Sequence, residues 1–350
     1  MIPIRNIYYM LSYAFQVLTE QGYKSIETEQ FGNVAELCAA ILSKGVSLQL
    51  KRGLRREYIE NTEPLSSLRG RIEISESVKT QSLLKHQMIC SYDVFSENSY
   101  MNRIIRATMD MLLHADIDKA RKRELRKLLV FFGDVEPLNV RSINWKMHYN
   151  RNNQTYRMLI SICYLVIKGL LQTNTDGSTR LMDFLDEQRM CRLYEKFILE
   201  YYRKEFPMLS ASASQIPWAL DDGISEMLPV MQTDITLVQG NKFLIIDAKY
   251  YSHTTQSQYS VHTLHSNNLY QIFTYVKNKE AALAEVPHEV SGMLLYAKTD
   301  ETLQPNNTYQ MSGNRISVQT LDLNCAFSDI AAQLNRIVTV FFDVDPDPNS

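Results

Sequence analysis

Two aspartates in the second half of the chain have the spacing of a metal-dependent hydrolase. Asp234 precedes the apolar run 235–238, and Asp247 follows the apolar run 243–246. Between the runs lies Gln-Gly-Asn-Lys at 239–242, and Gly-Asn between extended apolar segments predicts a two-residue β-hairpin loop. Counting outward from this loop places Asp234 opposite Asp247, with Cβ atoms roughly 4.5–5.5 Å apart on one face of the sheet. Two carboxylates at that distance repel one another, so the pattern predicts a bound divalent cation.

Lys249 is expected on the same face, because residues two apart on a strand project to the same side. Mg²⁺ prefers oxygen ligands and usually binds through one or two carboxylates together with water and substrate phosphate. Such an ion generates hydroxide and stabilises an in-line displacement. Lys249 would orient the attacking water or neutralise charge developing on phosphorus. We therefore predict Asp234 and Asp247 as Mg²⁺ ligands and phosphodiester hydrolysis as the reaction.

An ordinary structural interpretation competes with this one. Asp-x-Lys arises by chance on the order of once in a chain of this length, and an aspartate beside a lysine on an exposed strand is usually a solvated pair that contributes little. The hydrophobic context favours a site, because 243–246 is a continuous apolar run of the kind found in a strand covered on both faces. An acid at the end of such a strand is expected at the rim of the sheet.

A helix is predicted over residues 266–276, with Ser266 or Asn267 as its N-cap. Its apolar side chains recur with the i, i+3, i+4, i+7 spacing of a buried stripe. Gln271 and Tyr275 lie four residues apart, together on another face of this helix. Their amide and phenol groups could hold substrate phosphate or the catalytic water, or Tyr275 could be an ordinary packing residue.

These residues resemble the signature of the PD-(D/E)xK nuclease superfamily, in the variant with a Gln-x-x-x-Tyr helix. More narrowly, the chain resembles the McrC family, the nuclease subunits of modification-dependent McrBC restriction systems. Thr233 stands where the superfamily's name has proline. The similarity is carried by seven segments spread over nearly the whole chain: 2–11, 70–73, 102–105, 193–197, 233–236, 246–251 and 268–271.

The resemblance implies a fold, a set of site residues and two partners. The fold is a nuclease domain with a central mixed sheet flanked by helices. The partners are modified double-stranded DNA and a McrB-like AAA+ GTPase hexamer, whose GTP turnover the chain would stimulate. The catalytic residues carried over by the resemblance are Asp234, Asp247, Lys249, Gln271 and Tyr275.

The resemblance also raises the question of a further glutamate. Relatives with this helix often carry a metal-binding glutamate on an earlier helix, and Glu195 and Glu200 lie in a predicted helix over 190–204. Both also fit the solvated flank of that helix, so neither is included in the predicted site. The apolar face of the helix is formed by Leu193, Tyr194, Phe197, Ile198 and Tyr201.

The composition is that of a soluble globular protein. With 350 residues, 45% of them hydrophobic and 22% charged, the chain is long enough for two domains with cores of their own. No apolar run approaches the ~18 residues of a membrane span, and Arg5 and Asn6 interrupt any signal-peptide pattern. The five scattered cysteines include no C-x-x-C pair. Such thiols are typical of a reducing compartment, so we expect a cytoplasmic protein.

A formal net charge of -2 excludes a globally basic nucleic-acid binder, so any attraction to phosphates must come from local clusters. Basic residues gather at 51–56, 69–71 and 119–127. The third cluster fits DNA contact, an acidic partner or the solvated face of a helix. No G-x-x-x-x-G-K-[ST] phosphate loop is present, so the chain is not expected to hydrolyse nucleotides alone.

We expect a mixed α/β protein of two domains. Residues 1–147 would form an α+β domain that docks onto the partner or contacts DNA, and residues 148–350 the endonuclease domain, after a polar linker at 148–154. Strand-like runs are expected near 48–50, 71–74 and 293–297. Besides the two helices already described, helices are expected at 4–18, 34–42, 101–114, 156–171 and 327–341.

The predicted function is that of a Mg²⁺-dependent DNA endonuclease subunit of a methylcytosine-directed restriction complex. Two other functions stay open. A non-catalytic regulatory or assembly subunit of a GTPase complex would not depend on Asp247. A repair exonuclease of the same superfamily would cut free DNA ends without any GTPase.

Overall fold

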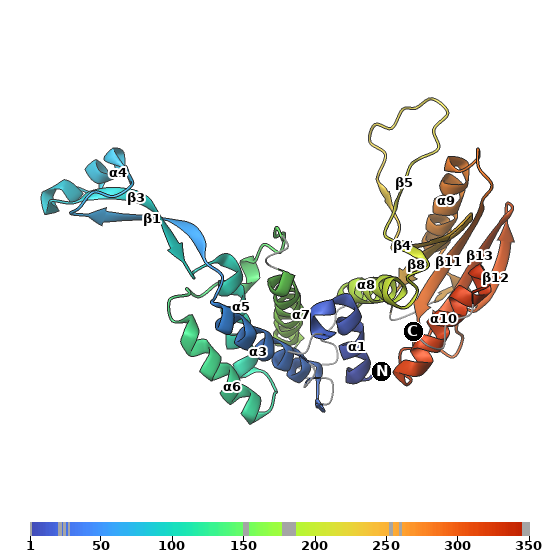
Figure 1. Ribbon diagram of the computed structural model, residues 1–350, viewed down its shortest axis with the longest axis horizontal. Helices are drawn as coiled ribbons and strands as arrows, with labels where there is room; N and C mark the ends of the chain where they lie inside the picture. The colour runs from blue at the N-terminus through green and yellow to red at the C-terminus, as the bar shows by residue number, and fades with distance from the viewer. Residues whose placement is uncertain are drawn as a thin grey trace. The chain divides into compact units, whose positions relative to one another are not determined.

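The protein divides into two compact units in a computed structural model. The structure describes residues 2–19, 23, 26, 29–149, 154–176, 187–251, 255–258 and 261–344. Met1–Glu20 and Leu185–Ser350 form one unit, which we call the sheet unit, and Gln21–Phe184 form the other, which we call the inserted unit (Figure 1). The second unit is therefore an insertion in the sequence of the first.

A six-stranded mixed sheet is the framework of the sheet unit. Its strand order is β12-β13-β11-β8-β7-β4, with β8, β11 and β13 mutually parallel and the other neighbours antiparallel. β11 is buried at all but its first residue, and β8 is buried from Leu244 to Ala248, which explains their apolar runs. The strands are β4 (Ser210–Ser212), β7 (Ile235–Gln239), β8 (Lys242–Lys249), β11 (Glu289–Ala297), β12 (Asn307–Met311) and β13 (Asn314–Leu321).

Helices cover both faces of this sheet, so the mixed α/β class is confirmed. On one face, Ile272 and Val276 of α9 pack into a core cluster with Leu294 of β11. On the other face lies α10, whose Ile337 lines a pocket with Leu295, and adjacent residues of a strand point to opposite faces. The helices of this unit are α1 (Ile4–Ala14), α8 (Glu187–Glu205), α9 (Ser266–Ala282) and α10 (Phe327–Phe342).

Four short strands complete the sheet unit. They form two separate two-stranded sheets, one before β7 and one before α9. No alternation of polar and apolar residues in these segments is long enough to predict them. They are β5 (Gln215–Ile216) with β6 (Met231–Gln232), and β9 (Thr255–Gln258) with β10 (Val261–Leu264).

A glycine sets the distance between α9 and the sheet. A Cβ atom on Gly292 of β11 would lie 2.8 Å from Val276 Cγ2 and 2.9 Å from Ile272 Cγ1. These distances are shorter than packed carbon atoms tolerate, so any larger side chain would push the helix outward. Gly292 therefore fixes how closely Gln271 and Tyr275 approach β8.

The inserted unit is α+β, as expected for the N-terminal part. Its three-stranded antiparallel sheet has the order β1-β3-β2 and packs with α4, while the longer helices pack against one another. Its strands are β1 (Glu57–Leu65), β2 (Arg71–Ile72) and β3 (Met88–Ser96). Its helices are α3 (Val34–Arg52), α4 (Ile74–Lys79), α5 (Tyr100–His114), α6 (Lys119–Leu129) and α7 (Gln154–Asp176).

The strand expected near 48–50 is wrong, because α3 continues through these residues to Arg52. The helix begins at an N-cap, where Asn33 accepts a hydrogen bond from the backbone N–H of Glu36 at 2.9 Å. Once a helix has formed, each added residue gains one backbone hydrogen bond at little cost. Three residues of alternating polarity are too few to oppose that propagation.

Helix α1 lies in the sheet unit, whereas the sequence placed it in a domain of residues 1–147. Asn6 is 3% exposed, and its Nδ2 donates to the carbonyl oxygens of Leu323 at 2.9 Å and Cys325 at 2.8 Å. These contacts join segments more than 300 residues apart. Hydrophobic periodicity within α1 predicts a buried face but does not identify what covers it.

Helix α7 lies in the inserted unit, whereas the expected boundary placed it in a domain of residues 148–350. It packs against α3 and α5. A Cβ atom on Gly45 of α3 would lie only 2.3 Å from Leu159 Cδ2 of α7, so the two helices are in close contact. The expected linker at 148–154 lies partly outside the described residues. No described helix combines the length and apolar character needed to cross a bilayer.

Candidate active site

The expected β-hairpin is present with the expected register. β7 and β8 pair antiparallel across a turn in which Gly240 has a φ of 58°, a left-handed conformation that glycine adopts without strain. The last ladder pair is Ile235 opposite Ile246. Asp234 lies in the bend just before β7, one residue beyond the last ladder pair, and its carboxyl group is near enough to that of Asp247 to affect its pKa. The predicted hairpin register is therefore confirmed, whereas an Asp234–Asp247 strand pair is not part of the ladder.

Burial opposes simultaneous ionisation of the two carboxyl groups. Asp247 is 1% exposed. Burial, opposed by Lys249 and reinforced by the carboxylate of Asp234, raises the pKa of Asp247 to about 7. Burial also raises the pKa of Asp234, although Lys249 and the backbone N–H of Ala248 lower it. That N–H donates to Asp234 Oδ2 at 2.9 Å. Such a pair favours a bound proton or a bound cation.

Lys249 is held against both Asp247 and helix α9. Its Nζ donates to Asp247 Oδ1 at 3.0 Å and lies 2.9 Å from Oδ2. It also donates to Gln271 Oε1 at 3.2 Å. Burial alone would lower the pKa of Lys249, but Asp247 and Asp234 outweigh it and raise the pKa. The ammonium group is therefore charged at neutral pH.

Helix α9 brings Gln271 and Tyr275 to the same place. Gln271 Nε2 donates to the Tyr275 hydroxyl at 3.0 Å, and that hydroxyl donates to the backbone carbonyl of Gln232 at 3.1 Å. Tyr275 is 8% exposed and belongs to the core cluster between α9 and the sheet, so it packs and hydrogen-bonds at once. The helix begins at Ser266 with His265 at its N-cap, one residue earlier than expected. Hydrogen bonds thus run from Lys249 to Asp247 and to Gln271 of α9, and from Tyr275 of α9 to Gln232, two residues before Asp234.

Glu195 of α8 lies near the same carboxyl groups, although the sequence analysis left it out. Burial and the carboxylate of Asp234 raise its pKa, and Cys191 Sγ lies 3.1 Å from Glu195 Oε1 as a hydrogen-bond donor. Glu200 makes a different contact: its Oε1 accepts a hydrogen bond from Arg203 Nη1 at 2.8 Å. The metal-binding glutamate that related nucleases often carry on an earlier helix was the signal that could have identified Glu195. Helical spacing alone did not distinguish the two residues.

The donor set fits a hard divalent cation. Asp247 Oδ2 is buried and, although it lies close to Lys249, receives no hydrogen bond of acceptable geometry from the described residues. Among the described residues, no three His, Cys, Asp or Glu side chains already surround one point. Mg²⁺ needs no such cage, because one or two carboxylates suffice when water and phosphate complete its shell. Asp234 and Asp247 would be the protein ligands.

Comparisons with known proteins find similarity to the components of one restriction system. The model of a family described as McrBC 5-methylcytosine restriction system components matches residues 4–297. The type IV methyl-directed restriction enzyme EcoKMcrBC of Escherichia coli K12 is 30% identical over 328 residues, which cover 92% of this chain and 93% of that protein.

Two solved structures from Thermococcus gammatolerans are also similar. One is a half-complex from a tetradecameric assembly of McrB AAA+ hexamers with bound McrC, at 17% identity and a TM-score of 0.46, covering 96% of this chain and 76% of that chain. The other is a cryo-EM structure of the McrBC complex, at 19% identity and a TM-score of 0.38, covering 58% of each chain.

Proposed function

Because the chain belongs to the family of McrBC 5-methylcytosine restriction system components, we propose that it is the Mg²⁺-dependent DNA endonuclease subunit of such a system. The substrate is double-stranded DNA that contains methylcytosine, and the reaction is hydrolysis of phosphodiester bonds. The partner is a McrB-like AAA+ GTPase hexamer, whose GTP turnover this chain stimulates.

The observation that supports nuclease activity most strongly is the clustering of side chains at the end of β8. Asp247, Lys249, Gln271 and Tyr275 follow one another through hydrogen bonds of 3.0–3.2 Å. Asp234 joins them through the backbone of Ala248. A purely structural ion pair on a strand needs neither a second buried acid nor an amide and a phenol arranged behind the lysine. The cost of burying these groups indicates a functional site.

Each side chain has a distinct role in the proposed reaction. Asp234 and Asp247 hold the Mg²⁺ ion, which when bound activates water and offsets charge on the phosphate. Lys249 lowers the pKa of Asp247, which favours its ionised form, and places a positive charge beside the scissile phosphate. Gln271 and Tyr275 fix the direction of the Lys249 side chain, so they act as positioning residues. Glu195 adds a third carboxylate beside Asp234, where it would hold water on the ion.

We assign partner docking to the inserted unit. Its β1 and β3 strands expose Tyr58 (75%) and Phe95 (54%), whose rings lie 5.0 Å apart, and α4 exposes Ile74 (65%). Two large apolar rings exposed side by side are typical of a protein–protein contact surface. The basic helix α6 of the same unit is the proposed DNA contact, since its cations suit phosphate groups.

Replacing one acid tests the proposed function. In a complex reconstituted with the partner GTPase, Asp247→Ala should reduce cleavage of methylcytosine-containing DNA by on the order of 100-fold or more, the scale expected when charge stabilisation is lost. Stimulation of GTP hydrolysis should persist, because the inserted unit is unchanged. Asp300→Ala, an exposed acid outside the site, is the matched control.

Two results would favour the other functions. Unchanged cleavage by the Asp247→Ala complex would remove this site assignment and leave a regulatory or assembly subunit. Degradation of free DNA ends by the chain alone, with no GTPase present, would indicate a repair exonuclease.

A further inference from the structure

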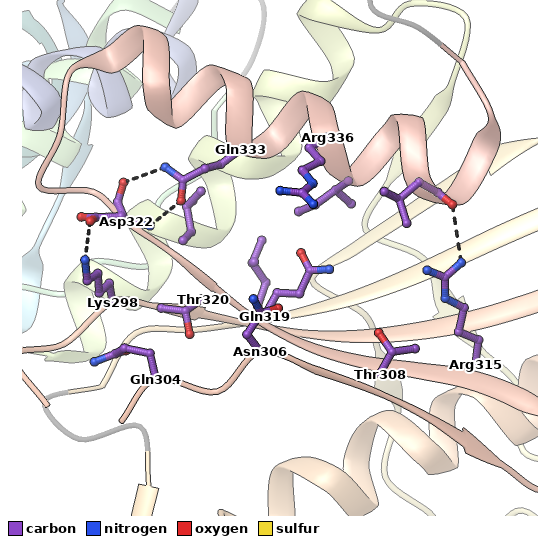
Figure 2. Close-up of a pocket in the computed structure, with 14 residues that line it drawn as sticks. Lys298, Gln304, Asn306, Thr308, Arg315, Gln319, Thr320, Asp322, Gln333 and Arg336 are labelled. Carbon is purple, nitrogen blue, oxygen red and sulfur yellow. Dashed lines mark hydrogen bonds and ion pairs between the residues drawn. The ribbon is translucent and has the colours of Figure 1, made fainter. Parts of the chain in front are cut away.

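A polar pocket of about 580 Å³ lies in the sheet unit between α10 and the strands β12 and β13 (Figure 2). Its volume is within the range of small-molecule sites. Leu295 lines it, whereas the next residue, Tyr296, pairs with Lys249 across β11 and β8 and packs with α9. Adjacent residues of a strand point to opposite faces, so the pocket and the candidate active site lie on opposite faces of the sheet.

Two arginines make one region of the pocket positive. Arg315 of β13 places its guanidinium 4.2 Å from the ring of Phe341, and its Nη1 lies 3.5 Å from the carbonyl oxygen of Val340. Arg336 reaches the pocket from α10 and makes no hydrogen bond or ion pair with the residues drawn in Figure 2. A guanidinium group presents several N–H donors in a planar fork that suits phosphate oxygens.

The other end of the pocket has a different character. Lys298 pairs with Asp322 at 2.6 Å, so their charges offset each other. Gln304 donates through Nε2 to the carbonyl oxygen of Glu301 at 2.7 Å, but its Oε1 is buried and accepts no hydrogen bond from the described residues. A buried acceptor without a donor is costly, which indicates that a ligand or water supplies one. This end therefore offers acceptors, while the arginine end offers donors.

The pocket is lined largely by polar side chains and opens to solvent, since Asn306, Thr308 and Arg336 are exposed. Here the sheet contributes Thr308 and Gln319, and the segment before β12 contributes Asn306. Figure 2 shows Gln319 and Asn306 in the middle of the pocket, and Thr308 on the side of Arg315.

We propose that this pocket binds a ligand of nucleotide chemistry, with phosphate at Arg315 and Arg336 and with base or sugar donors at Gln304 and Asp322. Arg315 and Asp322 are seven residues apart along an extended segment, a span of roughly 23 Å. A free nucleotide is shorter than this span and would contact one end of the pocket, whereas a short single strand would reach both ends. The ligand is therefore a free nucleotide or a segment of a DNA strand. The proposal does not depend on nuclease activity.

Binding to the purified full-length chain tests the proposal. The first probe is a short fluorescein-labelled oligodeoxythymidylate, measured by anisotropy, and the second is GMP, measured by calorimetry. Both titrations contain EDTA, so phosphodiester hydrolysis cannot affect the result. Binding of GMP identifies a free nucleotide as the ligand source, and binding of the oligonucleotide alone identifies a DNA strand.

Three variants locate the binding. Arg336→Ala should weaken binding by at least about tenfold, the effect expected when one charged hydrogen-bond donor is lost. Arg336→Lys should bind with intermediate affinity, because it keeps the charge without the planar fork. Lys279→Ala is the control, since Lys279 lies on α9 with its Nζ 5.0 Å from the ring of Phe243. Failure of both probes to bind, or equal affinities for Arg336→Ala and Lys279→Ala, would overturn the proposal.

Discussion

Under the proposed function, the raised pKa of Asp247 predicts that Mg²⁺ binding weakens sharply below neutral pH. A metal ligand must be ionised, so protons and Mg²⁺ compete for this carboxylate. Its pKa of about 7 means that roughly half of the groups are ionised at pH 7 but only about 1% at pH 5. The apparent affinity for Mg²⁺ should therefore fall about 50-fold over that range. At saturating Mg²⁺ this corresponds to a loss of about 2 kcal/mol of stabilisation.

The metal-free chain should show the opposite trend. The pKa of Asp247 is higher in the folded state than its ordinary value of 3.8, so between about pH 4 and pH 7 the folded state binds more protons than the unfolded state. The free energy of unfolding therefore falls as pH rises through this window. The decrease is at most about 4 kcal/mol, because each unit of pKa shift is worth about 1.4 kcal/mol.

Urea unfolding at several pH values between 5 and 8, with excess Mg²⁺ or with EDTA, measures both trends. Asp247→Asn is the control, because an amide of the same shape neither titrates nor binds the ion strongly. This variant should lose the Mg²⁺-dependent stabilisation and most of the pH dependence in EDTA. Equal stabilisation by Mg²⁺ at pH 5 and pH 8 in the wild-type chain would refute the reasoning.

Three further predictions follow from named contacts. Lys249→Met should reduce DNA cleavage by the reconstituted complex about 100-fold or more, while urea unfolding at pH 8 still shows Mg²⁺ stabilisation, because both carboxylate ligands remain. Gly292→Val should lower the free energy of unfolding by about 1–3 kcal/mol because it forces α9 outward, and cleavage should fall with it; an unchanged unfolding midpoint would contradict this. A fragment of residues 148–350 should fail to give a cooperative unfolding transition by circular dichroism, because it lacks α1 and the bonds from Asn6, whereas the full chain should unfold cooperatively.

Local sequence was sufficient to predict the geometry of the hairpin and of helix α9. Gly-Asn between two apolar runs determines the turn, and the turn determines which residues pair. Asp234 and Asp247 were placed opposite each other on that basis alone. The four-residue spacing of Gln271 and Tyr275 likewise placed them on one helix face, although nothing in the sequence showed that this face approaches Lys249.

Features that depend on distant segments were not predictable in this way. The unit boundaries depend on which elements cover α1 and α7. Those contacts produce no periodic pattern in the sequence. Glu195 lies near Asp234 only because α8 crosses β7 and β8. The pocket beside Arg336 needs α10 over β13, and its polar residues are scattered along the sequence without a motif. Close approach at Gly292 was also invisible, because a glycine within a strand has several possible causes.

The insertion has a consequence for how the chain is made. Helix α1 leaves the ribosome early, but Leu323 and Cys325, which accept its hydrogen bonds, are added 317 and 319 residues after Asn6. At typical translation rates the delay is roughly 15–60 s. The inserted unit ends at Phe184, before the first strand of the six-stranded sheet begins at Ser210. Under the proposed function, the nascent protein can thus meet its GTPase before it is able to cut DNA.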